Sequence, residues 1–203
     1  MGKSNIREKP LLCNAQVVRN FLEGRQTQDR RPIKPQPEYG VEPCYFSPTG
    51  WAETNERGLC SCVPVRPHYS VGDHLYVRET WAECVPNFCE WPQIVYKATD
   101  PTKEFNSEFY GWRPSIHMPK KYARIWLEVT KVRAERIQEI SASGAFNEGC
   151  NYLGSDGELH HIGDHPSYSL LEFEQLWKKL YPGSWERNEW VFAYNLKMME
   201  RNP

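Results

Sequence analysis

The sequence lacks any long hydrophobic run. No apolar stretch approaches the roughly 20 residues that a helix needs to span a bilayer, and the mean hydropathy is -0.72. The N-terminal decapeptide MGKSNIREKP contains no apolar core of the kind found in secretory signals. We therefore expect a cytoplasmic protein that has no membrane partner.

Three further absences narrow the fold class. The chain has no glycine-rich phosphate loop, no internal repeat and no regular alternation of strand and helix patterns, so a doubly wound nucleotide-binding sheet fits less well than a mixed or antiparallel fold. Prolines and aromatic residues are abundant instead: 16 Pro, 8 Trp, 11 Tyr and 8 Phe in 203 residues. This composition predicts many turns and an aromatic-rich interior.

Seven cysteines form an odd number in a chain without a signal peptide, which is typical of reduced thiols. Cys60 and Cys62, with Cys44, Cys84 or Cys89, could in principle hold zinc, but a C-x-C spacing is unusual for such a site. A second, loosely spaced group of possible ligands lies in an acidic loop: His160, His161, Asp164 and His165. We interpret the thiols as buried or incidental, and we expect no metal and no cofactor.

Hydrophobic periodicity predicts three helices, at residues 15–23, 141–149 and 169–181. Asn14 is the expected N-cap of the first helix, and Gly24 follows its end. Ser169 and Glu172 have the spacing of a capping box at the start of the third helix. Pro182 ends that helix.

Alternating apolar residues predict strands at 74–81, 94–98, 123–129 and 190–198, with a bulge or break between Val129 and Val132. Prolines at 32, 35 and 37 favour an extended edge or loop after the first helix. Residues 38–70 show no clear periodicity and are interpreted as a partly irregular insertion. The pattern predicts an α+β protein, built as a small mixed or antiparallel β-barrel with flanking helices and long loop insertions.

Charge is unevenly distributed although the net charge is -1. Residues 1–40 hold eight Lys and Arg against four Asp and Glu, and residues 113–136 hold seven against two. Residues 137–190 hold three against nine. If the two basic segments meet, they form a positive patch of the kind that binds phosphate or nucleic acid. Two separate solvated faces are an equally good interpretation.

Four segments taken in order resemble the ASCH domain family, in particular its phage and prophage branch: KPLLCNAQVVRNFLEGRQTQDRR, VGDHLYVRETW, WRPSIHMPKKYARIWLEVTKVRAERIQEIS and WERNEWVFAYNLK. The resemblance implies one PUA-like β-barrel domain over residues 1–203, with insertions at about 38–70 and 150–168. It also implies a cleft between the barrel and the first helix. Members are proposed to bind RNA or modified nucleosides, so the expected partner is RNA, DNA or a modified nucleoside, in the host cytoplasm if the chain is phage encoded.

One branch of that family hydrolyses acetylcytidine with a lysine, a threonine and a glutamate, and these positions fall on Gln26, Asp29 and Glu148. Gln26 cannot act as a base and Asp29 has no hydroxyl, so the resemblance implies loss of that amidohydrolase reaction. If Asp29 and Glu148 face one cleft, the two carboxylates could share a proton and hydrolyse a modified nucleoside by another route. A surface carboxylate is the other interpretation of Glu148.

Other side chains could contact a ligand. Arg30 and Arg31 suit phosphate, or else form a solvated basic turn. Trp81 could stack on a base, or lie in the core as most tryptophans do. The expected ligand-binding residues are Gln26, Arg30, Arg31, Arg78, Glu79, Trp81, Arg113, Ser115 and His117. A third possible function is a phage protein-interaction role for the insertion at 38–70.

Overall fold

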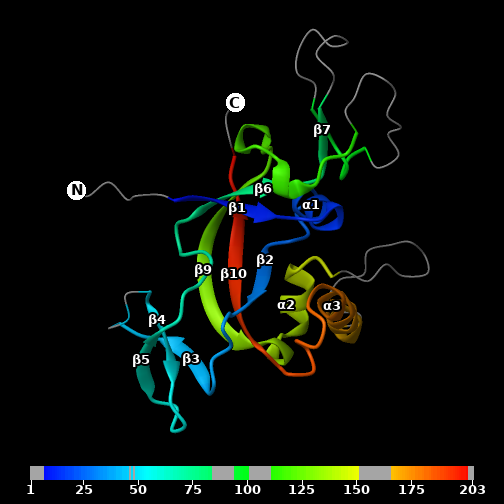
Figure 1. The fold of residues 1–203 in the computed structure, drawn as a ribbon. Helices are drawn as coiled ribbons and strands as arrows, with labels where there is room; N and C mark the ends of the chain where they lie inside the picture. Colours follow the sequence, from blue (N-terminus) through cyan, green and yellow to red (C-terminus); the bar gives the residue numbers. More distant parts are fainter. Residues whose placement is uncertain are drawn as a thin grey trace. The chain divides into compact units, whose positions relative to one another are not determined.

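The computed structural model describes residues 7–45, 47, 49–83, 94–100, 111–150 and 166–200 (Figure 1). The chain divides into two compact units, each assembled from segments that are distant in the sequence. The first unit comprises residues 1–25, 72–128 and 197–203, and the second comprises 26–71 and 129–196. The expected single domain over the whole chain stays a prediction.

The largest sheet has five strands in the order β1-β6-β9-β10-β2. Their bounds are Glu8–Leu12 (β1), Gln28–Pro32 (β2), His74–Arg78 (β6), Trp126–Arg136 (β9) and Trp190–Met198 (β10). β1 pairs with β6 in parallel, whereas the β6–β9 and β10–β2 pairs are antiparallel. The predicted α+β class is confirmed. Strands β1 and β2 are the edges of this sheet, and no closed barrel is found in the part of the chain that the structure describes.

The first unit contains helix α1, which runs from Ala15 to Leu22 as predicted. The Asn14 side chain accepts a hydrogen bond from the backbone N–H of Val17 at 3.0 Å, and Gly24 has a φ of 69° that favours glycine. The predicted strand at 74–81 is divided. β6 ends at Arg78, and β7 (Trp81–Glu83) pairs separately with β8 (Ile94–Tyr96).

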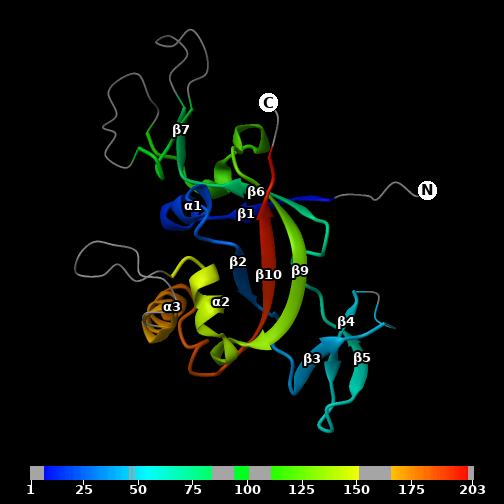
Figure 2. The same cartoon turned by 180° about the vertical axis from the view of Figure 1, so that it is seen from behind.

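Among its described residues, the second unit contains the α-helices α2 (Ala142–Asn147) and α3 (Pro166–Leu180), which lie side by side in both views (Figure 1 and Figure 2). They enclose a buried cluster that includes Ile137, Ala145, Phe173, Trp177 and Val191. None of the helices in the described ranges is long and apolar enough to cross a membrane.

The capping box expected at Ser169 and Glu172 is wrong, because α3 begins at Pro166. Proline suits the first turn of a helix, where its missing N–H costs no hydrogen bond. Ser169 therefore lies inside the helix and is only 4% exposed.

Residues 38–70 are more regular than expected. They form a three-stranded antiparallel sheet in the order β3-β4-β5, with bounds Gly40–Pro43, Trp51–Thr54 and Cys60–Pro64. The remainder of the described segment is irregular, as expected, and the strands were not predicted because they are short and β5 is mostly exposed, so apolar residues do not alternate along it. Gly40 allows β3 to approach β4 closely, since a Cβ at this position would lie 2.7 Å from Thr54 Oγ1.

Strand β9 also differs from its prediction. It runs as one strand from Trp126 to Arg136, so no break divides it between Val129 and Val132, whereas the alternative of a bulge there stays a prediction. The apolar alternation stops there because the strand passes from buried to more exposed positions after Val129. Apolar residues alternate along a strand only where one of its faces is buried, so the alternation disappears where both faces are solvated.

Candidate functional site

In the second unit, the segment that follows α1 meets the C-terminal end of α2. Gln26 forms an isolated antiparallel bridge with Glu148, and the Thr27 N–H donates to the Asn147 carbonyl oxygen at 2.8 Å. Residues opposite each other in an antiparallel pair project their side chains to the same side. Gln26 and Glu148 are therefore neighbours, and both are buried, with 6% and 8% exposed.

Arg30 lies at the centre of a buried polar network. Its side chain is 1% exposed. Its Nε donates to Glu135 Oε1 at 2.7 Å, and its Nη1 donates to Glu148 Oε1 at 2.8 Å and to Gln28 Oε1 at 3.2 Å. This guanidinium divides its donors among three acceptors, so Arg30 is a buried structural cation rather than a solvated one.

Gly144 allows helix α2 to approach this network. A Cβ at this position would lie 2.9 Å from Arg30 Nη2 and 3.0 Å from Ile140 Cγ1. These separations are shorter than ordinary contacts, and Arg30 is held in place by its ion pairs. A larger residue at 144 would therefore push α2 away from Arg30.

Glu148 has the most perturbed carboxyl group near this site. Its pKa is raised from 4.5 to about 7: burial is the main cause, Arg30 opposes it, and the Asp29 charge adds to it. A single hydrogen bond from a shared guanidinium compensates this burial only in part. Near pH 7, Glu148 is therefore present both as the protonated acid and as the carboxylate.

Asp29 is paired elsewhere. Successive strand residues point to opposite faces, so Asp29 and Arg31 share the face that Arg30 does not occupy. Asp29 accepts from Arg31 Nε at 2.7 Å and from Arg31 Nη2 at 3.3 Å, and this carboxylate raises the pKa of Arg31. No hydrogen bond joins Asp29 to Glu148 within the described ranges. The Asp29 charge contributes to the raised pKa of Glu148, and a proton shared between the two carboxylates stays a prediction.

Gln26 carries an unsatisfied acceptor. Its Nε2 donates to the Gln28 carbonyl oxygen at 2.9 Å, whereas its Oε1 is buried and has no hydrogen-bond partner among the residues described. A buried polar atom left unpaired costs about 1–3 kcal/mol, so native structures rarely keep one without a reason. A ligand N–H would satisfy it.

Sequence reasoning missed the partners of Arg30. Glu135 lies in a segment with a strong excess of basic residues, and it also accepts from Arg133 Nε at 2.8 Å. Arg133 Nη1 in turn donates to Asn195 Oδ1 at 2.7 Å. The Arg133-x-Glu135 spacing, which places both side chains on one face of a strand, was the signal available in the sequence.

The other expected ligand-binding residues belong to the first unit. Glu79 is 1% exposed, and both its oxygens accept from Arg124, at 2.9 Å from Nε and 2.9 Å from Nη2. Arg78 donates to the Ile116 carbonyl oxygen, and its Nε has no partner in the described part of the chain. Glu79 thus forms a closed bidentate pair.

Trp81 lies in the core of the first unit with 2% of its surface exposed. The Arg113 guanidinium is 5.0 Å from the ring centroid, and the Tyr122 ring is 5.1 Å away. Ser115 and His117 lie on a short 3-10 helix, where Ser115 is half-buried and His117 is exposed. In the described conformation the Trp81 ring already has protein neighbours.

The residues best placed to hold a metal are Cys44, Cys60 and Cys62 in the second unit. The hydrogen bond with Cys44 raises the pKa of the Cys60 thiol to about 11. The other ligands considered from the sequence lie outside the described residues: Cys84, Cys89, His160, His161, Asp164 and His165.

Comparisons of the chain with protein-family models, with curated proteins and with solved structures found no match. Function is therefore inferred from the geometry around Gln26 and Glu148, together with the motif resemblance.

Proposed function

We propose that the chain is an ASCH-type protein, PUA-like in fold, that binds a nucleobase at Gln26 and Glu148, in RNA, DNA or a free modified nucleoside. The observation that carries the proposal is the buried Gln26 Oε1, which lacks a hydrogen-bond partner beside a buried carboxyl group. Nucleobases carry N–H donors on a flat edge, and proteins read these edges with amide and carboxyl side chains. The motif resemblance independently favours the same two residues.

The protonation state of Glu148 decides which base edge fits. A protonated Glu148 offers a donor beside the Gln26 acceptor, which matches the ring nitrogen and amino group of a cytosine-type edge. An ionised Glu148 offers two adjacent acceptors, which match the neighbouring N–H groups of a guanine-type edge. Because burial raises the pKa of Glu148 to about 7, both forms are available near neutrality.

A binding titration tests the proposal. The full chain is titrated with cytidine, acetylcytidine, guanosine and a single-stranded RNA, and Gln26→Met is compared with the exposed control Gln16→Leu. Loss of one hydrogen bond weakens affinity by about tenfold in Gln26→Met and leaves the control unchanged. If no probe binds saturably at low salt, or if Gln26→Met binds as tightly as the wild type, the proposal is wrong.

The dependence on salt separates the possible ligands. Nucleic-acid binding releases counterions, so log K falls linearly with log salt, whereas binding of an uncharged nucleoside hardly changes. In this account Arg31 is the more accessible arginine for a phosphate, with 26% of its side chain exposed, while Arg30 is enclosed.

A hydrolase acting on a modified nucleoside is the second candidate. It is favoured by the raised pKa of Glu148, because a carboxyl group that titrates near 7 suits general acid–base catalysis. Since Asp29 is paired with Arg31, Glu148 would have to activate water without it. Incubation with acetylcytidine tests this: turnover that is lost in Glu148→Gln supports it, and turnover that survives in that variant excludes Glu148 as the base.

A further inference from the structure

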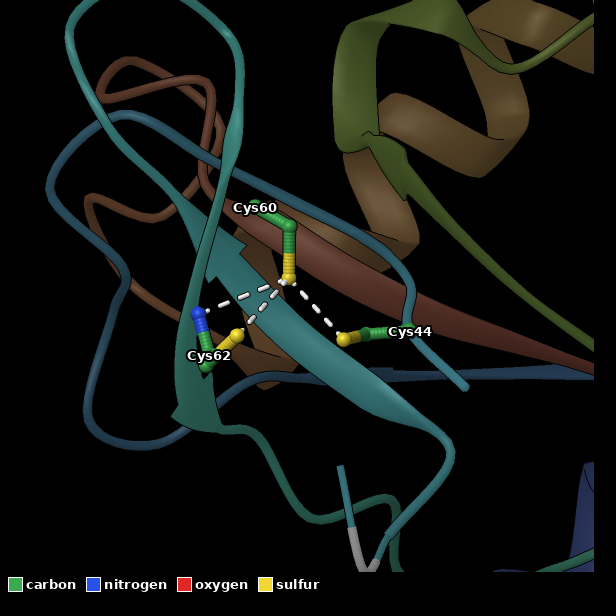
Figure 3. A group of neighbouring side chains, drawn as sticks. All are labelled: Cys44, Cys60 and Cys62. Atoms are coloured by element: carbon green, nitrogen blue, oxygen red, sulfur yellow. Dashed lines mark hydrogen bonds between the residues drawn. The ribbon is translucent and has the colours of Figure 1, made fainter. Parts of the chain in front are cut away.

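The small sheet of residues 38–70 gathers three thiols at one place. Cys44 follows β3, and Cys60 and Cys62 lie on β5. Their side chains point toward one another (Figure 3), with Cys60 Sγ at 2.9 Å from Cys44 Sγ and at 3.9 Å from Cys62 Sγ. All three sulfur atoms lie within 4.8 Å of one another. These cysteines come from segments that are 16 residues apart, so folding brings them together.

The burial of these thiols differs from that of structural cysteines. Cys13 and Cys150 are buried, with 5% and 2% exposed, as expected for cysteines that pack as small apolar residues. Cys60 is only partly buried and Cys62 is exposed. Packing of apolar surface therefore explains Cys13 and Cys150, but it does not explain why two more exposed thiols turn toward Cys44.

The backbone conformation around Cys62 directs its thiol toward Cys60 Sγ. Ala52 faces Pro64 and Thr54 faces Cys60, so two residue steps along β4 match four along β5, and β5 bulges between these pairs. Cys62 itself has a φ of 59°, which side-chain-bearing residues rarely adopt. Bulges redirect side chains, and unfavourable backbone conformations concentrate at functional sites.

The geometry points to a binding site for a thiophilic divalent cation, zinc by class, held by the thiolates of Cys44, Cys60 and Cys62. With Zn–S bonds of about 2.3 Å in a tetrahedral arrangement, neighbouring sulfurs lie about 3.8 Å apart. The observed Sγ–Sγ separations from Cys60, 2.9 Å to Cys44 and 3.9 Å to Cys62, lie below and above this value. The Cys62 N–H donates to Cys60 Sγ at 3.4 Å. The fourth ligand would be water, because Cys62 is exposed to solvent.

The ion would stabilise a sheet that has little interior of its own. Four of the five residues of β5 are exposed, and only Val41 and Ala52 of the apolar residues in β3 and β4 are buried. A metal that joins the end of β3 to β5 supplies a cross-link where hydrophobic burial is scarce. This site is independent of Gln26 and Glu148, so it can fail without affecting the proposed function.

Metal titration of the full chain tests the site. The protein is reduced, stripped with a chelator and titrated with Co²⁺, whose thiolate complexes absorb in the near ultraviolet, and then with Zn²⁺, which displaces it. One ion per chain is expected, together with a rise in melting temperature. Cys62→Ser, an exposed change that preserves the fold, weakens affinity by at least about 100-fold, because loss of even outer-shell partners costs 10–100-fold. Cys13→Ala, the matched control, binds as the wild type does.

Three results would overturn the site. The first is that Cys62→Ser and the wild type bind Zn²⁺ with equal affinity. The second is that the reduced wild type binds no more ion than a variant with serine at all three positions. The third is that Cys44 and Cys60 resist alkylation after mild oxidation and show the mass of a disulfide, while the reduced protein binds no ion.

Discussion

Each compact unit buries one glutamate against an arginine, and the two pairs differ in how well the charges are matched. In the first unit, both oxygens of Glu79 accept from Arg124, which is also 4.1 Å from the Tyr96 ring centroid. In the second unit, Glu148 receives one hydrogen bond from Arg30, which also serves Glu135 and Gln28.

The two pairs show that the compensation of a buried carboxylate charge depends on how many of the guanidinium donors it receives. A bidentate pair satisfies both oxygens of a carboxylate and leaves it fixed as a structural charge. A shared guanidinium leaves the carboxylate undercompensated, so burial raises the pKa of Glu148 to about 7. We infer that Glu79 stabilises the fold, whereas Glu148 remains chemically available.

The largest effect is expected from Arg30→Leu. This change leaves the buried Glu148 without its guanidinium donor, whereas Glu135 keeps Arg133, and we expect a loss of about 3–5 kcal/mol in the free energy of unfolding, measured with urea. Arg187→Leu, at an exposed pair with Glu189, is the control and costs less than about 1 kcal/mol. Equal losses in the two variants would show that Arg30 is not the centre of the network.

Arg124→Leu is expected to cost less, about 2–3 kcal/mol, because Arg124 is 27% exposed and water can partly solvate Glu79.

The comparison of the two ion pairs is sharpened by removing both partners of each pair. Arg124→Leu with Glu79→Leu recovers most of the loss, since no charge remains unpaired. Arg30→Leu with Glu148→Leu recovers less, because Glu135 Oε1 loses its Arg30 donor while Glu135 keeps its charge, with Arg133 as the remaining partner. Full recovery in both double variants would contradict the distinction.

The stability of the wild type depends on pH through Glu148. Its folded pKa is raised to about 7 from 4.5, so the folded state binds this proton more tightly than the unfolded state. The contribution of protonated Glu148 to the free energy of unfolding is fully present below about pH 4.5. It is lost as the pH rises toward 7, and the free energy of unfolding then falls by about 1–3 kcal/mol. Glu148→Gln removes this slope, whereas Glu79→Gln keeps it. Urea unfolding at several pH values measures the difference, and identical profiles for wild type and Glu148→Gln would refute the assignment.

Gly144→Ala has the smallest expected effect, about 1–2 kcal/mol, because the added methyl group meets Arg30 Nη2 and Ile140. The exposed helix position Ser143 gives a control, since Ser143→Ala introduces no new contact. Thermal unfolding compares the two. A stability gain for Gly144→Ala, as expected from helix propensity alone, would show that α2 does not need the close approach.

Local features were predictable from the sequence. The Asn14 cap, Gly24 and the alternating residues of β10 each depend on neighbours within a few positions, and the structure confirms all three elements. The start of α3 was missed because the pattern of Ser169 and Glu172 competes with the preference of proline for a first helical turn.

Long-range charge pairing was not predictable. Arg30 resembles a solvated arginine in the sequence because its acceptors Glu135 and Glu148 lie 105 and 118 residues away. Cys44, Cys60 and Cys62 were among the possible zinc ligands in the sequence, but their grouping could not be predicted from spacing, since the bulge in β5 depends on its pairing with β4. Partners of this kind are set by strand register, which single-sequence patterns do not specify.

The most direct test is a titration of the glutamate carboxyl carbons by NMR, in the wild type and in Glu148→Gln. The account predicts one glutamate resonance that titrates near pH 7 in the wild type and is absent from the variant. If every glutamate in the wild type titrates below about pH 5, as unperturbed carboxyl groups do, Glu148 is an ordinary ion-pair partner, and its availability to a base or a water molecule is contradicted.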